Sequence, residues 1–246
     1  MCRHVGYLGS PRSLASLIDA PHGLRAQGEA PREMVVADSN PDGWGIAWWT
    51  SPQLAPLQYR SIEPIWTETG FHHADDCSTA ILAAARKASP GTTLRVVNNA
   101  PFVAETRLGA VAFSLNGHAF HGGTEARLRA EVPSHIELAG DTDSEVVFAI
   151  LRGRIDAGDP LGPALAAVHA IVSPAPDAYV NLMAMTASQL AATTWRHSLS
   201  LHRTPGGSTL ASEALDEDPR WERIPDAHLV AIDHHGAFLT PLEGTR

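Results

Sequence analysis

The order in which strand-like and helix-like segments follow one another is the feature of this sequence that most constrains its fold. Short apolar runs bounded by turn residues, which are typical of strands, occur through the first half of the chain and return near its end. The longer segments with helical period lie between them. A chain of βαβ units would instead alternate the two kinds throughout. The order therefore predicts an α+β fold with substantial β-sheet.

The expected strands share an apolar character and flanking turn residues. We expect them over residues 43–49, 108–115, 178–185, 189–195, 229–232 and 237–239. The last four would form two hairpins, and the run 108–115 would end at Asn116-Gly117. Residues 79–85 are apolar throughout, so their period does not distinguish a buried strand from a buried helix.

Three segments are expected to be helical, at residues 11–18, 143–157 and 161–171. The second is the best defined, because residues 141–144 read Asp-Thr-Asp-Ser and each of these types is a favoured N-cap. Apolar residues then recur on one face of the segment, as a helix that packs against a core requires.

Length and composition limit the classes of protein that this chain can belong to. Its 246 residues suit one large domain, and we expect a single domain over residues 1–246. It is 44% hydrophobic and 18% charged, which is ordinary for a globular protein that buries a core. The net charge of −9, without a basic stripe, argues against nucleic acid or an anionic membrane as a partner. The oligomeric state is left open, a homo-oligomer included.

The cellular compartment is expected to be the cytoplasm. No apolar run approaches the roughly 18 residues that a membrane span needs, and the N-terminus lacks the layout of a signal peptide. The only cysteines are Cys2 and Cys77, which argues against a disulfide scaffold and against a four-thiolate zinc site.

Cys2 follows Met1 directly, and its thiol is the first candidate for a nucleophile. Cysteine is small enough for Met1 to be cleaved, which would leave a free α-amine on the residue that carries the thiol. An α-amine titrates near about pH 8, so it could take the thiol proton and later return it to a leaving amine. The alternative is a chance cysteine that packs as a small hydrophobe. Residues 1–9 favour the nucleophile because they place the thiol at the head of an apparent strand.

Several short motifs occur in the order in which class II glutamine amidotransferases carry them. They are Met1-Cys2-Arg3-His4 with Tyr7-Leu8-Gly9, Asp42-Gly43-Trp44-Gly45-Ile46-Ala47, Ala85-Arg86-Lys87-Ala88-Ser89, Asn98-Asn99-Ala100-Pro101-Phe102, Asn116-Gly117, Thr142-Asp143-Ser144-Glu145 and Ala211-Ser212-Glu213. Each motif is weak evidence alone, but together they cover nearly the whole chain. The sequence therefore resembles this family, and more closely its stand-alone members that act as γ-glutamyl hydrolases in ergothioneine biosynthesis.

The resemblance implies both a fold and an activity. The fold would be the four-layer αββα sandwich of N-terminal-nucleophile hydrolases, with two stacked antiparallel sheets between helix layers. The activity would be an amidohydrolase without cofactor or metal, whose substrate is a small γ-glutamyl compound, γ-glutamyl-hercynylcysteine sulfoxide. Cys2 would attack the γ-glutamyl carbonyl, with its own α-amine as the base.

The same resemblance implies roles for four further residues. Arg86 would bind the substrate α-carboxylate, for which its planar fork of donors is suited, although a structural ion pair is the alternative. Asp143 would pair with the substrate ammonium, although aspartate is also a favoured helix N-cap. Asn116 and Gly117 would form an oxyanion hole, a role that competes with a plain Asn-Gly hairpin turn.

Three residues near these motifs complete the expected substrate site. Ser89 occupies the place of a family threonine that helps to bind glutamate, and Asn98 lies in a stretch that the family uses near the glutamyl pocket. His118 follows the oxyanion pair and either lines the substrate pocket or faces solvent. Two departures bear on glutamine use and pocket shape: Leu115 stands where many members have histidine, and Lys87 where many have tryptophan.

Two other groups of residues are candidate binding sites. Residues 72–77 read His-His-Ala-Asp-Asp-Cys and contain zinc-ligand types, but consecutive histidines point apart, so a solvated helix start is favoured. The six tryptophans are either core residues or an aromatic wall for a trimethylammonium group.

The hydrolase is not the only function that this sequence allows. A glutaminase subunit that delivers ammonia to a separate synthase would use the same residues. A non-catalytic binding module would keep the fold, and retention of Met1 would favour it because the base would then be an amide.

Overall fold

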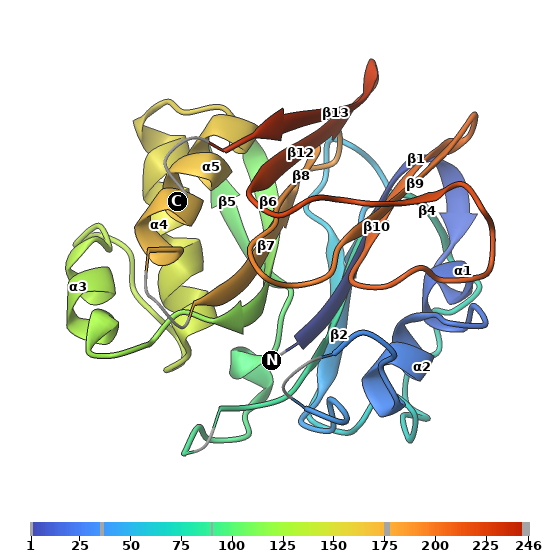
Figure 1. The fold of residues 1–246 in the computed structure, drawn as a ribbon, viewed down its shortest axis with the longest axis horizontal. Coiled ribbons are helices and arrows are strands. Elements are labelled where there is room, and N and C mark those ends of the chain that lie inside the picture. Colours follow the sequence, from blue (N-terminus) through green and yellow to red (C-terminus); the bar gives the residue numbers. More distant parts are fainter. Residues whose placement is uncertain (1, 35–36, 90, 175–177, 243–246) are drawn as a thin grey trace.

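Two antiparallel β-sheets stacked face to face form the centre of the protein, and helices cover the outer face of each sheet (Figure 1). The computed structural model describes residues 2–34, 37–89, 91–174 and 178–242. The layers follow in the order helix, sheet, sheet, helix. This arrangement confirms the predicted α+β fold and its αββα sandwich.

The first sheet has seven strands in the order β11-β9-β10-β1-β4-β2-β3. Their bounds are β1 Cys2–Ser13, β2 Trp44–Trp48, β3 Leu57–Ser61, β4 Cys77–Arg86, β9 Ser200–Thr204, β10 Gly207–Ala211 and β11 Trp221–Arg223. The central strand β1 pairs with β10 along one edge and with β4 along the other. The strand that begins with Cys2 is therefore hydrogen-bonded to a neighbouring strand along each edge.

The second sheet has six strands in the order β13-β12-β8-β7-β6-β5. Their bounds are β5 Phe102–Thr106, β6 Gly109–His118, β7 Tyr179–Met185, β8 Leu190–Thr193, β12 His228–Asp233 and β13 Gly236–Pro241. The two expected hairpins are confirmed as the antiparallel pairs β7–β8 and β12–β13.

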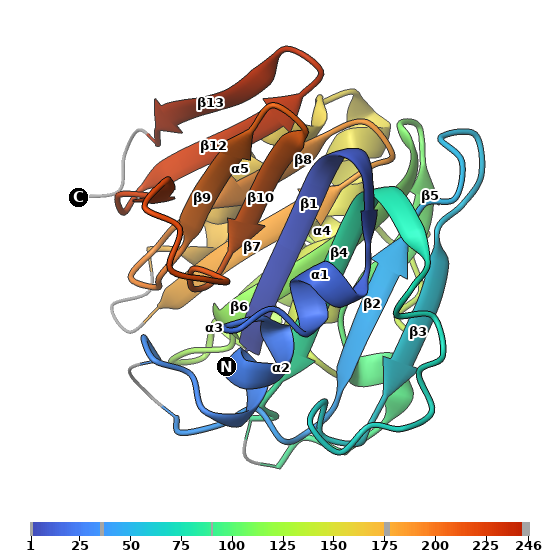
Figure 2. The same cartoon turned by 90° about the vertical axis from the view of Figure 1, so that its right-hand side faces the viewer.

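Short helices cover the first sheet and long helices cover the second (Figure 2). On the first lie α1 (Ala15–Ile18) and α2 (Leu24–Glu29), and on the second lie α4 (Asp143–Ala157) and α5 (Leu161–Val172). A third short helix, α3 (Thr124–Ala130), contacts α4. The Thr142 hydroxyl caps α4 by accepting a hydrogen bond from the backbone N–H of Glu145 at 3.2 Å.

Two expected boundaries were wrong, and pairing between strands explains both. Residues 11–18 are not one helix, because β1 continues through Ser13 and pairs there with Cys77 of β4. The run that begins near residue 108 does not end in a turn, because Asn116 and Gly117 pair with Asn181 and Val180 of β7. The ambiguous run 79–85 lies within β4.

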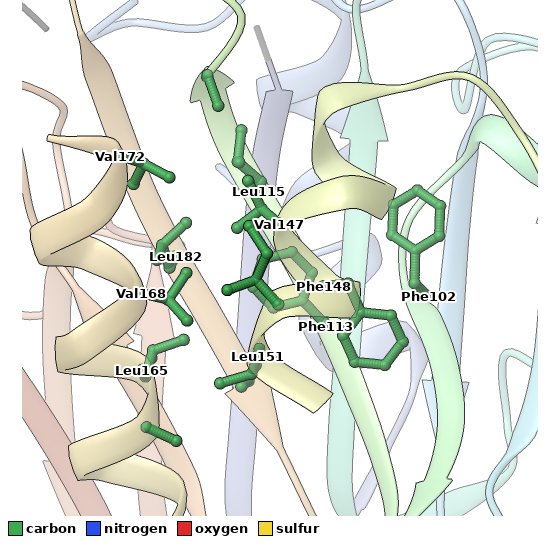
Figure 3. Packing of buried hydrophobic residues seen from close by; sticks show 14 of the residues in the cluster. Phe102, Phe113, Leu115, Val147, Phe148, Leu151, Leu165, Val168, Val172 and Leu182 are labelled. Carbon is green, nitrogen blue, oxygen red and sulfur yellow. The ribbon is translucent and has the colours of Figure 1, made fainter. Parts of the chain in front are cut away.

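Alternation along β6 divides its side chains between two different cores. Phe113 and Leu115 face the long helices, where the Phe113 ring stacks on Phe148 with centroids 5.4 Å apart (Figure 3). Each of these buried side chains stabilises the fold by about 1.5–3 kcal/mol. The alternate residues Ser114 and Asn116 face the first sheet, where they contact the side chains of His4 in β1 and of Ser212, which directly follows β10. One strand therefore anchors the core and also carries polar groups to the N-terminal end of β1.

Candidate active site

Cys2 begins β1 at the point where the first sheet meets the end of β6. It is half-buried, and its Cα partner on β4 is Arg86. Its backbone nitrogen donates a hydrogen bond to Oδ1 of Asn116 at 3.2 Å. The expected removal of Met1 concerns a residue outside the described part of the chain. If that residue were cleaved, the nitrogen that contacts Asn116 would become the α-amine.

A pocket opens beside Cys2. Its lining comes from the first residue of β1, the end of β4 with the loop after it, the end of β6 with the segment that follows, and the start of α4. The residues are Cys2, Arg86, Lys87, Ser89, Thr92, Gly117, His118, Phe120, Asp141, Thr142, Asp143 and Ser144. Six of the expected site residues share this lining, namely Cys2, Arg86, Ser89, Gly117, His118 and Asp143. The fold therefore gathers residues that are up to 141 positions apart in the sequence, from Cys2 to Asp143.

Arg86 is the last residue of β4, and its side chain is almost completely buried. Its Nη1 donates to Oδ1 of Asn99 at 3.2 Å, while Nδ2 of Asn99 donates to the carbonyl of Ser61 at 2.6 Å. Asn99 thus fixes one side of the guanidinium and leaves the pocket side for a ligand. A buried cation that lines a cavity is well suited to a carboxylate, because a planar fork binds both oxygens.

Asn116 and Gly117 belong to β6 and not to a turn. Asn116 is fully buried behind Cys2, where Oδ1 faces the Cys2 nitrogen and Nδ2 donates to the hydroxyl of Ser212 at 3.4 Å. Gly117 lines the pocket with φ of +145°, and a Cβ there would lie 1.8 Å from the carbonyl oxygen of Tyr179. Only glycine allows the β6 backbone to pass so close to β7 next to the thiol.

Asp143 and His118 form a hydrogen-bonded pair in the wall of the pocket. Nδ1 of His118 lies 3.0 Å from Oδ2 of Asp143 and 3.2 Å from the hydroxyl of Ser89. The hydrogen bond to Asp143 raises the pKa of His118 above its usual 6.5. Burial opposes ionisation of Asp143, but His118 and the N–H groups of Ala119 and Ser144 hold its pKa below 3.8. Asp143 is therefore a carboxylate at neutral pH, and its hydrogen bond to His118 favours the protonated form of that imidazole.

The N-cap of α4 is Thr142 and not Asp143. The Asp143 carboxylate is therefore free of that task. It accepts instead from the Ala119 N–H at 2.6 Å and from the Ser144 N–H at 2.7 Å. These two bonds fix the carboxylate at the edge of the pocket.

Asn98 does not line the pocket, in contrast to the expected substrate role. Its Nδ2 donates to the Thr93 carbonyl at 2.9 Å and to Oδ1 of Asp141 at 2.8 Å, and its Oδ1 accepts from the Asp141 N–H at 3.3 Å. With its donors engaged and its side chain buried, Asn98 connects two segments of the pocket wall. Asn98 and Asn99 are adjacent and of the same type, so the sequence does not show which of them contacts Arg86. Only the tertiary structure shows that it is Asn99.

Neither the tryptophans nor the His-His segment contributes to this pocket. Trp44 and Trp48 are buried in the core beneath α1 and α2, and no tryptophan in the described part of the chain lines the pocket. His73 pairs with Asp76 at 3.0 Å on the surface, in a loop and not at a helix start. Among the described residues, no group of three His, Cys, Asp or Glu side chains is placed to hold a metal ion. No described helix has the length and apolar content required to cross a membrane.

Comparisons with known proteins identify the family of this chain. The model of the family described as "Glutamine amidotransferases class-II" matches residues 27–186. The "Gamma-glutamyl-hercynylcysteine sulfoxide hydrolase" of Mycobacterium tuberculosis (strain CDC 1551 / Oshkosh) is 35% identical, over 99% of this chain and 97% of its own length. The protein of that name from Mycolicibacterium smegmatis is 37% identical, over 98% of this chain and 100% of its own.

Two solved structures show the same fold at low identity. A glutamine aminotransferase class-II domain protein from Silicibacter pomeroyi superposes with a TM-score of 0.64 and 19% identity, covering 99% of this chain and 100% of that one. Glutamine phosphoribosylpyrophosphate amidotransferase from B. subtilis gives 0.73 and 13%, covering 98% of this chain and 49% of that one. The family match and the full-length relatives lead to one conclusion: the chain belongs to the class II glutamine amidotransferases.

Proposed function

We propose that this protein is an amidohydrolase that cleaves the γ-glutamyl amide bond of γ-glutamyl-hercynylcysteine sulfoxide, giving glutamate and hercynylcysteine sulfoxide. The observation that carries the proposal is the shared pocket of Cys2, Arg86 and Asp143. A thiol, a carboxylate receptor and an ammonium receptor around one cavity are what a γ-glutamyl group requires. The names of the full-length relatives supply the leaving group.

The glutamyl end of the substrate is recognised by charge. Arg86 binds the α-carboxylate with the donors that Asn99 leaves free. Asp143 binds the α-ammonium and exchanges His118 for it. Ser89, whose hydroxyl lies 3.2 Å from Nδ1 of His118, contributes a further polar contact on the same wall.

The reaction begins at the γ-carbonyl. After removal of Met1, the α-amine of Cys2 takes the thiol proton, and the thiolate forms a bond to the carbonyl carbon. The negative oxygen of the tetrahedral intermediate is stabilised by Nδ2 of Asn116 and the N–H of Gly117, each contribution being on the order of 3 kcal/mol. The C–N bond then breaks, and the α-ammonium gives its proton to the leaving amine.

Hydrolysis of the acyl-enzyme completes the cycle. Water attacks the γ-glutamyl thioester with the same α-amine as base, the C–S bond breaks, and glutamate leaves with the thiol regenerated. The hydrogen bond between the Cys2 nitrogen and Oδ1 of Asn116 supports this scheme, because it keeps the base in a fixed position in both halves of the reaction.

Intact mass and product release test the proposal together. The purified protein would be weighed and then incubated with γ-glutamyl-hercynylcysteine sulfoxide and, separately, with glutamine. We expect a mass without Met1 and glutamate release from the sulfoxide, lost in Cys2→Ala. Release from glutamine alone would indicate a glutaminase subunit instead. Retained Met1 with no release from either compound would refute an enzymatic role.

A further inference from the structure

Ser212 is a buried hydroxyl in direct contact with the oxyanion residue Asn116, and the reaction scheme above does not use it. It follows β10 and is fully buried. Its Oγ accepts one hydrogen bond from the backbone N–H of His4 at 3.0 Å and a second from Nδ2 of Asn116 at 3.4 Å. The hydroxyl therefore bridges the two sheets immediately behind Cys2.

The contacts of the Asn116 amide define how its two ends are used. Oδ1 faces the Cys2 nitrogen at 3.2 Å, and one Nδ2 hydrogen is taken by Ser212. An amide nitrogen carries two hydrogens, so the second remains for the oxyanion. Because the two bonds lie at opposite ends of the amide group, together they fix its plane relative to the thiol. A donor held in place before the reaction costs no reorganisation when the charge develops.

The position of Ser212 is fixed because Ser212 and Glu213 contact residues of β1 that lie on opposite faces of that strand. Its own N–H donates to the His4 carbonyl at 2.9 Å. On the opposite face, the carboxylate of Glu213 lies 3.1 Å from Nε of Arg3, and both side chains are completely buried. The Glu213 backbone carbonyl accepts from Nε2 of Gln27 at 3.0 Å. The Ser212-Glu213 pair thus attaches to the two residues that follow Cys2.

We propose that Ser212 is the positioning residue of the oxyanion hole, and that its hydroxyl orients the Asn116 amide toward the oxygen formed by attack of Cys2. The inference rests on the proposed γ-glutamyl hydrolysis. Ser212 does not touch the substrate, so its loss lowers turnover and leaves ground-state binding unchanged.

The test compares Ser212→Ala with Ser78→Ala, a matched control. Ser78 is also a buried hydroxyl of the first sheet that accepts a backbone N–H, from Ala80 at 3.2 Å, but it lies at the other end of β4 from Arg86. We expect Ser212→Ala to lower kcat on the order of tenfold to a hundredfold, short of the 10²–10³ of losing the donor itself. KM should stay within about twofold, and Ser78→Ala should keep full turnover.

Two further readouts distinguish orientation of Asn116 from damage to the nucleophile. Iodoacetamide alkylates a thiolate without forming an oxyanion, so its rate at Cys2 should be the same in Ser212→Ala and in the wild type. In an Asn116→Ala background, Ser212→Ala should have no additional effect on kcat, because the group that it orients is gone. Additive losses, or a kcat for Ser212→Ala equal to the wild type, would overturn the inference.

A crystal structure of Ser212→Ala separates this inference from the proposed reaction. We expect the Asn116 amide to rotate or to occupy more than one orientation, whereas it should be unchanged in Ser78→Ala. A rotated amide in a protein whose wild type releases no glutamate would refute the proposed function, while still showing that Ser212 orients the Asn116 amide. An unrotated amide would refute the role of Ser212, whatever the activity.

Discussion

Substrate binding should weaken as the pH falls, because the substrate ammonium and the His118 imidazolium compete for Asp143. In the structure Nδ1 of His118 lies 3.0 Å from Oδ2 of Asp143, and the hydrogen bond raises the pKa of His118 above 6.5. Binding of a γ-glutamyl group replaces His118 at Asp143 in the proposed complex. A protonated His118 must then lose its partner and either release its proton or face the incoming cation.

The sign and size of the effect follow from these contacts. His118 is protonated below its raised pKa. The affinity for the γ-glutamyl ligand is therefore highest above the pKa of His118 in the unliganded protein and decreases as the pH falls through that pKa. A charged hydrogen bond contributes about 1.5–3 kcal/mol. Because the His118 side chain is 34% exposed, solvent partly screens its interaction with Asp143. We therefore use the lower end of this free-energy range. We therefore expect a loss of affinity of roughly tenfold, with an onset above pH 6.5.

Isothermal titration calorimetry can measure this loss on the inactive Cys2→Ala variant, with a γ-glutamyl amide as ligand, between about pH 5 and about pH 7.5. Buffers of different ionisation enthalpy would count the protons released. In His118→Gln the pH dependence should vanish. His121→Gln is the matched control, because the ring of His121 lies 4.7 Å from that of His118. The affinity of this variant should depend on pH in the same way as that of Cys2→Ala alone. An affinity that is independent of pH, or the same dependence in His118→Gln, would refute the competition.

Three further predictions concern the pocket and the fold. Arg86→Lys should raise KM about tenfold or more with little change in kcat, since it loses the bidentate fork; a kcat defect at normal KM would contradict this in steady-state assays. Gly117→Ala should cost about 2 kcal/mol or more in urea unfolding because of its positive φ and the clash with Tyr179; an unchanged midpoint would argue against it. Burial lowers the pKa of His4 to about 3 and that of His169 to about 4. As the pH falls, both histidines are therefore protonated in the unfolded chain at a higher pH than in the folded protein. Stability should fall below about pH 6.5 by up to about 1.4 kcal/mol per unit for each histidine, and His169→Gln should reduce the slope seen by thermal unfolding.

Local sequence patterns were sufficient for elements whose partners are near in the chain. The helix of residues 143–157 agrees with its predicted bounds, because its cap and its apolar face are local properties. The two hairpins were also found, because a short turn sets their pairing. The segment 11–18 failed because a distant strand, β4, continues the ladder past Arg12.

The sequence by itself determined the residue types of the candidate site, and only the tertiary structure decided how they are used. Cys2, Arg86, Asn116 and Asp143 could be named because the short motifs that contain them resemble, in the same order, those of the class II glutamine amidotransferases. The order of these residues along the chain does not give the distances between them. It therefore did not reveal that His118 pairs with Asp143 or that Ser212 contacts Asn116. Such contacts depend on which faces of β1 and β6 meet when the two sheets stack, and that is set by packing of the whole core.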